Sequence, residues 1–197
     1  MTAAREILWR RTLDGLSFEH LRIGLGTDGP ELAGTVLIAE AGMPLRVEYR
    51  IACDAAWRTR SVEITQTHAG TLATLRLDHD LAGTWRRNGT AAPDLDGCSD
   101  VDLGVSPSTN ALPINRLGLP PGGSARIRAA WVLFPGLEVV AAEQDYERLG
   151  AARYRYRSVA SGFEAAIDVD EEGFPIDYAG IWQRLAAGPI APPLPRL

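Results

Sequence analysis

The stretch Leu45-Arg46-Val47-Glu48-Tyr49-Arg50-Ile51 alternates strictly between apolar and charged residues. Successive side chains of a β-strand point to opposite faces, so this alternation predicts a strand with one buried face and one wet face. The same period of two recurs in Ser61-Val62-Glu63-Ile64-Thr65 and, less strictly, over residues 72–78. The period of two therefore predicts that the chain is mainly β.

Strand-like stretches fill most of the remaining chain, and turn residues separate them. We expect further strands at residues 18–25, 32–39, 125–134, 138–148, 153–159 and 163–169. Strands of about eight residues at roughly ten-residue spacing predict a meandering antiparallel sheet. So many strands cannot form one flat sheet, so the sheet must close or roll up.

Residues 93–123 interrupt this pattern with several prolines and glycines. Within them, Ser106 can cap a helix whose first position Pro107 suits, because proline lacks an amide that would be unpaired there. Pro113 is expected to end or kink this short helix, and Arg116 to lie in a second turn. A single short helix in a β-protein is typical of a plug or a lid.

The 197 residues suit one domain, which we place at residues 1–187. Residues 188–197 are rich in proline and are expected to form an extended tail. Gly24-Leu25-Gly26-Thr27-Asp28-Gly29 matches a dinucleotide-binding pattern, but Pro30 and another strand follow where that motif needs a helix. We interpret it as a hairpin turn.

Composition excludes several functions. The net charge of −5 and the absence of lysine argue against a nucleic-acid partner, a Walker phosphate loop and Schiff-base chemistry. Two cysteines, Cys53 and Cys98, are predicted to be reduced thiols. The N-terminus does not resemble a signal peptide and no apolar run could span a bilayer, so we expect a cytoplasmic protein.

Two polar patches are candidates for a site. Residues 94–102 hold four aspartates, whose spacing is not that of an EF-hand; they suit turns, sugar hydroxyls or pairing with arginine. In Cys53-Asp54-Ala55-Ala56-Trp57-Arg58-Thr59-Arg60, a tryptophan flanked by arginines suits stacking on a sugar, or plain packing. No catalytic residues, metal ligands or cofactor site can be assigned from the pattern.

Four stretches together resemble a known family. They are Ile7-Leu8-Trp9-Arg10-Arg11, residues 49–60, residues 95–103 running into 106–114, and Tyr154-Arg155-Tyr156 with Ser161-Gly162-Phe163. The chain resembles the DUF1089 family of bacterial proteins, which are labelled glycolipid-binding. The resemblance implies a spiral β-roll, a many-stranded sheet around one short helix, similar to the half-barrels of bacterial lipoprotein carriers. It also implies a tendency to form homodimers.

Our leading hypothesis is a non-catalytic protein that binds a glycolipid or similar amphiphile, with the acyl chain against the inner face of the sheet. The expected ligand-binding residues are Asp54, Trp57, Arg58, Arg60, Asp96, Asp100, Asp102, Thr109, Asn110 and Arg116. The first alternative is an enzyme acting on a small polar metabolite, with Cys98 or a carboxylate in a pocket lined by the 94–102 acids and Arg116. The second alternative is a purely structural network of these charges.

Overall fold

The computed structural model describes residues 4–13, 17–40 and 42–190. Its strands are β1 (Arg5–Arg11), β2 (Phe18–Leu25), β3 (Pro30–Glu40), β4 (Met43–Cys53), β5 (Thr59–His68), β6 (Thr71–His79), β7 (Trp85–Arg87), β8 (Thr90–Ala91), β9 (Asp100–Leu103), β10 (Ser124–Val132), β11 (Val139–Arg148), β12 (Arg153–Ser158), β13 (Glu164–Val169), β14 (Pro175–Tyr178) and β15 (Trp182–Pro189). The helical elements are the 3-10 turns η1 (Pro93–Leu95) and η2 (Ser108–Asn110) and the α-helix α1 (Ala111–Leu117).

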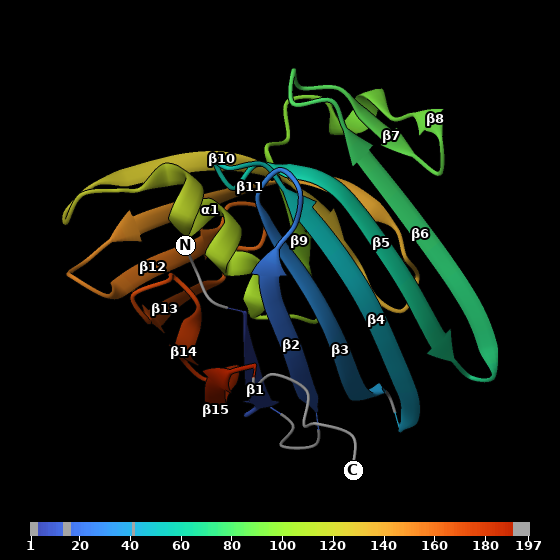
Figure 1. Ribbon diagram of the computed structural model, residues 1–197, viewed down its shortest axis with the longest axis horizontal. Coiled ribbons are helices and arrows are strands. Elements are labelled where there is room, and N and C mark those ends of the chain that lie inside the picture. The colour runs from blue at the N-terminus through green and yellow to red at the C-terminus, as the bar shows by residue number, and fades with distance from the viewer. Residues whose placement is uncertain (1–3, 14–16, 41, 191–197) are drawn as a thin grey trace, which may run out of the picture.

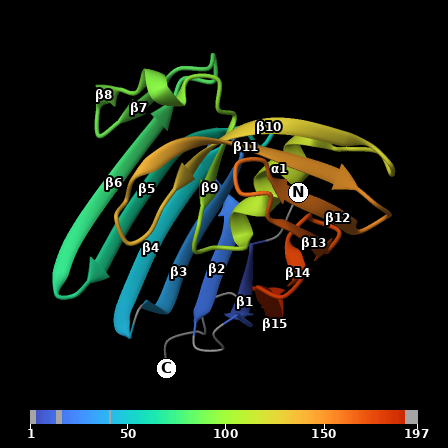
Figure 2. The ribbon, with the colours of Figure 1, turned by 180° about the vertical axis from the view of Figure 1, so that it is seen from behind.

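All of these strands join one sheet. Its order is β8-β7-β6-β5-β4-β3-β2-β1-β15-β14-β13-β12-β11-β10-β9, in which every neighbouring pair is antiparallel except β9 and β10. β1 pairs with β15, so the two halves of the chain meet through its first and last strands. The sheet curls around α1, with β2–β6 on one side and β10–β13 on the other (Figures 1 and 2). The predicted all-β fold rolled around one short helix is confirmed.

The last strand of the sheet order, β9, is tied to the opposite half of the roll by side chains. The Val101 amide donates to Thr59 Oγ1 at 3.1 Å, and the Trp85 indole Nε1 donates to the Cys98 carbonyl at 2.9 Å. These bonds bring β9 and the segment before it against β5 and β7. The roll is therefore closed by side-chain contacts while the sheet itself stays open.

The helical segment lies in the predicted region, where the 3-10 turn η2 runs directly into α1, and it includes Arg116 as expected. Ser106 Oγ accepts a hydrogen bond from the Ser108 amide at 3.1 Å, which is the expected capping contact. Pro113 does not end the helix, because it is the third residue of α1, where a backbone amide has no partner inside the helix. The helix ends at Gly118, which adopts a left-handed conformation with φ 51°.

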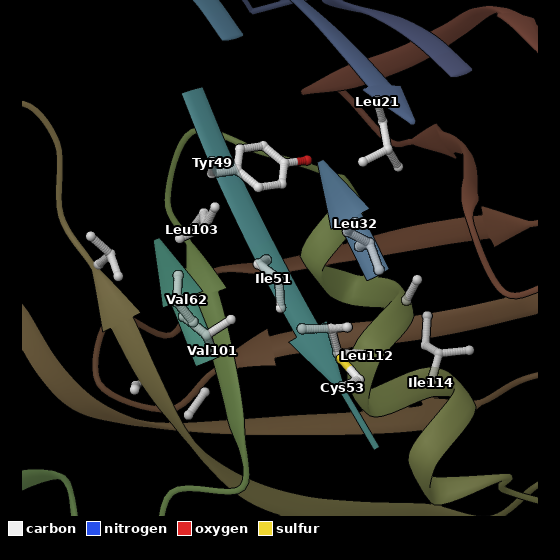
Figure 3. Packing of buried hydrophobic residues seen from close by; sticks show 14 of the residues in the cluster. Leu21, Leu32, Tyr49, Ile51, Cys53, Val62, Val101, Leu103, Leu112 and Ile114 are labelled. Carbon is white, nitrogen blue, oxygen red and sulfur yellow. The ribbon is translucent and has the colours of Figure 1, made fainter. Parts of the chain in front are cut away.

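The space inside the roll is filled by packed side chains. Leu112 and Ile114 of α1 face Ile51 and Cys53 of β4, and Val101 of β9 lies in the same buried cluster (Figure 3). Ile51 lies on the face of β4 that the alternation of residues 45–51 predicted to be buried. The inner face of this half of the sheet therefore holds protein side chains at the place where an acyl chain was expected.

Several strands and one boundary differ from the sequence prediction. Strands β1, β7, β8, β9, β14 and β15 were not expected. β15 extends to Pro189, which pairs with Arg5, so residues 188 and 189 of the expected tail belong to the sheet. Residues 191–197 lie outside the described part of the chain. The Gly24–Gly29 stretch forms the β2–β3 hairpin, as predicted, with the Gly26 amide donating to the Gly29 carbonyl at 2.8 Å.

Candidate functional site

A cavity of about 300 Å³ lies in the C-terminal half of the roll, next to the end of β9 and η2. Its polar lining comes from residues that include Arg11, Asp102, Ser106, Asn110, Gln144 and Ser161. Its apolar lining includes the aromatic residues Trp131, Tyr156, Phe163, Tyr178 and Trp182. Pockets for small ligands commonly combine such apolar walls with a few polar groups.

The aromatic wall is a connected set of rings. Tyr156 makes an edge contact with buried Tyr146, at a centroid distance of 5.4 Å, and with Tyr178 at 6.1 Å. Phe163 continues the set outward, 6.2 Å from Tyr156. Burial raises the pKa of Tyr156 and Tyr178 well above the ordinary value, so both hydroxyls stay protonated. The wall therefore offers neutral rings and hydroxyl donors.

Trp131 reaches the cavity because a glycine lies beside it. A Cβ at Gly104 would lie 3.0 Å from Trp131 Nε1 and 3.2 Å from the Val132 carbonyl oxygen. Real Cβ atoms rarely approach that closely, so a larger residue would push the indole away. Gly104 thus fixes the position of the indole in the wall.

Asp102 is the carboxylate at the polar end of the cavity. Gln144 Nε2 donates to Asp102 Oδ2 at 2.6 Å, and Thr109 Oγ1 donates to Asp102 Oδ1 at 3.2 Å. Burial raises the pKa of Asp102, and the nearby charge of Asp100 adds to the effect. Within the described residues Asp102 forms no ion pair. Each carboxylate oxygen keeps a lone pair for another donor.

A second polar cluster lies behind Ser106. Glu19 is fully buried on β2, and its Oε1 accepts hydrogen bonds from the Tyr49 hydroxyl and, at 2.9 Å, from Ser106 Oγ. Ser108 Oγ lies 2.7 Å from both the Tyr49 hydroxyl and Ser106 Oγ. Among the described residues Glu19 Oε2 has no hydrogen-bond partner, and burial raises the pKa of Glu19 to about 7. This cluster links β2 and β4 to the start of the helix.

Three of the predicted ligand-binding residues meet at the cavity. Asp102 and Asn110 line it, and Thr109 holds Asp102. Asn110 is itself fixed, since its Oδ1 accepts the Tyr146 hydroxyl proton at 2.9 Å and its Nδ2 donates to the Pro107 carbonyl at 3.1 Å. These contacts orient the polar end before any ligand arrives.

Asp100 and Arg116 form a buried ion pair beside the cavity and do not line it. Arg116 Nε donates to Asp100 Oδ1 at 2.9 Å and Nη2 to Oδ2 at 2.6 Å. The four aspartates of residues 94–102 thus take separate partners, in order Arg87, Trp85, Arg116 and Gln144. Asp96 is exposed, and its Oδ1 accepts the Trp85 amide at 3.4 Å.

The patch of residues 54–60 spans the β4–β5 connection and the start of β5, and it is not part of the cavity. Asp54 accepts hydrogen bonds from the Ala56 and Arg58 amides at 3.0 and 2.9 Å and pairs with the Arg58 guanidinium. Trp57 packs edge-on against Phe174 at 6.1 Å, and Arg60 pairs with Asp28 at 2.6 Å. The ligand-binding role expected of Asp54, Trp57, Arg58 and Arg60 stays a prediction.

Glu19 and Gln144 were missed by the sequence analysis, although the alternation carries a signal for both. Glu19 shares the buried face of β2 with Leu21 and Ile23. Gln144 shares the buried face of β11 with Tyr146. A polar residue at an apolar position of the alternation must find a partner inside the protein. That signal marks both residues for a functional or structural network.

The fold and the cavity define a single-sheet β-roll with an aromatic, carboxylate-bearing pocket. The family model described as "Putative glycolipid-binding" matches residues 6–184, and the chain belongs to this family. It is similar to the crystal structure of a DUF1089 family protein from Pseudomonas aeruginosa, with 38% identity and a TM-score of 0.78. The match covers 86% of this chain and 92% of that one. No curated protein matches the chain. The family resemblance seen in the sequence is confirmed.

In the part of the chain that the structure describes, no helix is long and apolar enough to cross a membrane.

Proposed function

We propose that the cavity binds the sugar headgroup of a glycolipid and holds it without chemical change. The observation that carries this proposal is Asp102, a carboxylate that faces an aromatic cavity and takes its hydrogen bonds from neutral Gln144 and Thr109. A carboxyl group so placed can accept hydrogen bonds from sugar hydroxyls on its free lone pairs, and such bonds are about twice as strong when the group is ionised.

The apolar walls of the cavity complement the apolar faces of a sugar ring. Sugar rings carry C–H faces, which suit the apolar faces of Trp131 and Tyr156, while the polar ends of tryptophan and tyrosine can still form hydrogen bonds. The volume of about 300 Å³ lies at the lower end of small-ligand pockets. It suits a compact headgroup better than a whole lipid, and the family description agrees with this ligand class.

The buried thiols favour binding over thiol catalysis. Burial raises the pKa of Cys98 to about 11 and that of Cys53 to about 12, and both side chains are almost fully buried. A nucleophilic cysteine needs a lowered pKa and access to substrate. Cys98, which the enzyme alternative invoked, has neither property.

Tryptophan fluorescence can test the proposal, since Trp131 and Trp182 line the cavity. We would titrate the protein with a panel of neutral methyl glycosides and compare Asp102→Asn with Asp145→Asn. Asp145 lies on the same strand as Gln144 and pairs with Arg126 on the outer surface, which makes it a matched control. We expect at least one glycoside to cause a saturable change in fluorescence. Asp102→Asn should weaken the affinity for that glycoside about tenfold, equivalent to about 1.4 kcal/mol.

Two results would contradict the proposal. One is that no glycoside in the panel changes the fluorescence of the folded protein. The other is that Asp102→Asn and Asp145→Asn bind a glycoside equally well, since Asp102 would then not touch the ligand.

A further inference from the structure

Exposed apolar side chains gather at one end of the sheet. Because neighbouring strands are antiparallel, the β1–β2, β3–β4, β5–β6, β12–β13 and β14–β15 turns all lie at the same end. Leu13, Phe18, Leu37, Met43, Leu72 and Phe163 lie in or near these turns and are exposed. The other end carries exposed Leu25, Leu149 and Ile176. The apolar surface is thus distributed unevenly between the two ends.

The lining of the cavity reaches the same end of the sheet. Leu13, Phe163 and Ile181, which we call the apolar rim, line the cavity and come from the β1–β2, β12–β13 and β14–β15 turns. Pairing of Arg11 with Trp182 sets the first and last of these turns side by side. Leu13 is 66% exposed and Phe163 41% exposed. Clustered, exposed apolar side chains mark an interaction surface.

The packed interior restricts where a lipid tail can go. The side chains of α1, β4 and β9 fill the roll (Figure 3), and the cavity suits a compact headgroup. A glycolipid bound by its sugar must therefore keep its acyl chains outside the protein, next to the rim. Water is an unfavourable place for those chains, whereas a bilayer already holds them.

We infer that the apolar rim docks on a lipid bilayer, so that a headgroup enters the cavity while its acyl chains remain in the membrane. This inference rests on the proposed function of the cavity. The net charge of −5 gives the protein no general attraction to anionic lipids. Docking is therefore driven by apolar burial, does not require anionic lipid, and changes little with salt.

A fluorescent label can report the docking directly. We would label Leu13→Cys with an environment-sensitive dye and mix it with phosphatidylcholine vesicles, with and without a monohexosyl diacylglycerol. Leu25→Cys, at the other end of the sheet, is the control. Native Cys53 and Cys98 are buried and do not compete for the dye in the folded protein. We expect a blue shift for the label at position 13 and none at position 25.

A matched pair of double variants tests the energetics. Leu13→Ser with Phe163→Ser removes two side chains of the rim, and Leu25→Ser with Leu149→Ser removes two of similar exposure from the other end. We expect the rim variant to lose more than tenfold in vesicle binding and far less in affinity for methyl glycosides, which Phe163 also affects because it lines the cavity. The control variant should match the original protein in both assays.

The outcomes separate this inference from the proposed function. If glycosides bind but the label at position 13 does not shift, or both double variants lose vesicle binding equally, docking by the rim is wrong and the cavity proposal stands. If the label shifts on vesicles but no glycoside binds, the rim docks as inferred and the headgroup proposal fails. If neither occurs, both are wrong.

Discussion

Asp100 on β9 accepts two hydrogen bonds from the guanidinium of Arg116 on α1, at 2.9 and 2.6 Å, and Ser99 Oγ donates a third at 3.0 Å. The carboxylate is almost fully buried, while Arg116 keeps a small exposed fraction. The ion pair holds α1 against β9, two positions away from Asp102, which lines the cavity. The structural role that was one alternative for this acidic cluster fits Asp100, while Asp102 remains available to a ligand.

Arg116→Ala is expected to destabilise the protein by about 3–5 kcal/mol, because it leaves the charge of Asp100 buried and unpaired. Chemical denaturation measures the loss. Arg126→Ala breaks a pair of the same two-bond geometry with Asp145 on the surface, at 2.7 and 3.0 Å, and is expected to shift the midpoint little. Equal losses in the two variants would show that burial of the Asp100 pair does not matter.

Glu19 predicts a pH dependence of stability. Its pKa in the folded state is about 7, against an ordinary value of 4.5, so the folded protein holds the proton more tightly than the unfolded chain. The contribution of Glu19 to the free energy of unfolding is therefore greatest below pH 4.5. It falls by about 3 kcal/mol as the pH rises to about 7. Glu19→Gln carries no such charge and should flatten this part of the curve.

Urea denaturation of both proteins between pH 5 and pH 8 checks this prediction. The difference in unfolding free energy between Glu19→Gln and the original protein should move in favour of the variant as the pH rises. Asp102 contributes in the same direction in both proteins, since its pKa is also raised, and therefore cancels in the difference. A constant difference across the range would show that Glu19 does not titrate there.

The period of two accounts for much of what could be predicted about the fold. It identified β2 at its observed bounds and most of the long strands, because each buries one face. It did not identify β9 or β14, which are four residues long, since four residues give too few alternations. The β1–β15 pairing joins residues at the two ends of the chain, and no local pattern reports such a distant contact.

The site was predictable only in part, because sequence proximity is a poor guide to convergence in space. Asp102 and Asn110 lie eight positions apart around one turn, and both reach the cavity. Asp100 is also an aspartate and lies two positions from Asp102, yet Asp100 forms an ion pair with Arg116. The aromatic wall comes from β10, β12 and the strands near the C-terminus, which only the rolled sheet brings opposite η2.

The two thiols should be unreactive in the folded protein. Burial raises the pKa of Cys98 to about 11 and that of Cys53 to about 12, so little thiolate forms at pH 8. We expect no reaction with Ellman's reagent at pH 8 under native conditions and release from both thiols after denaturation. If one thiol of the native protein reacts rapidly, and this reaction is lost in Cys98→Ser but kept in Cys53→Ser, the prediction is wrong. Cys98 would then be a candidate nucleophile.

Gly104→Ala should weaken ligand binding through Trp131 while leaving the roll folded. The added methyl group would lie 3.0 Å from the indole Nε1, so the ring must move within the cavity wall. We expect a severalfold loss of glycoside affinity and a shifted tryptophan emission spectrum. Gly24→Ala is the control, since a Cβ at Gly24 meets nothing within 4 Å. If the emission spectrum of Gly104→Ala shifts but its glycoside affinity is unchanged, the ligand does not contact the Trp131 ring. The sugar ring would then pack against Tyr156 and Trp182 instead.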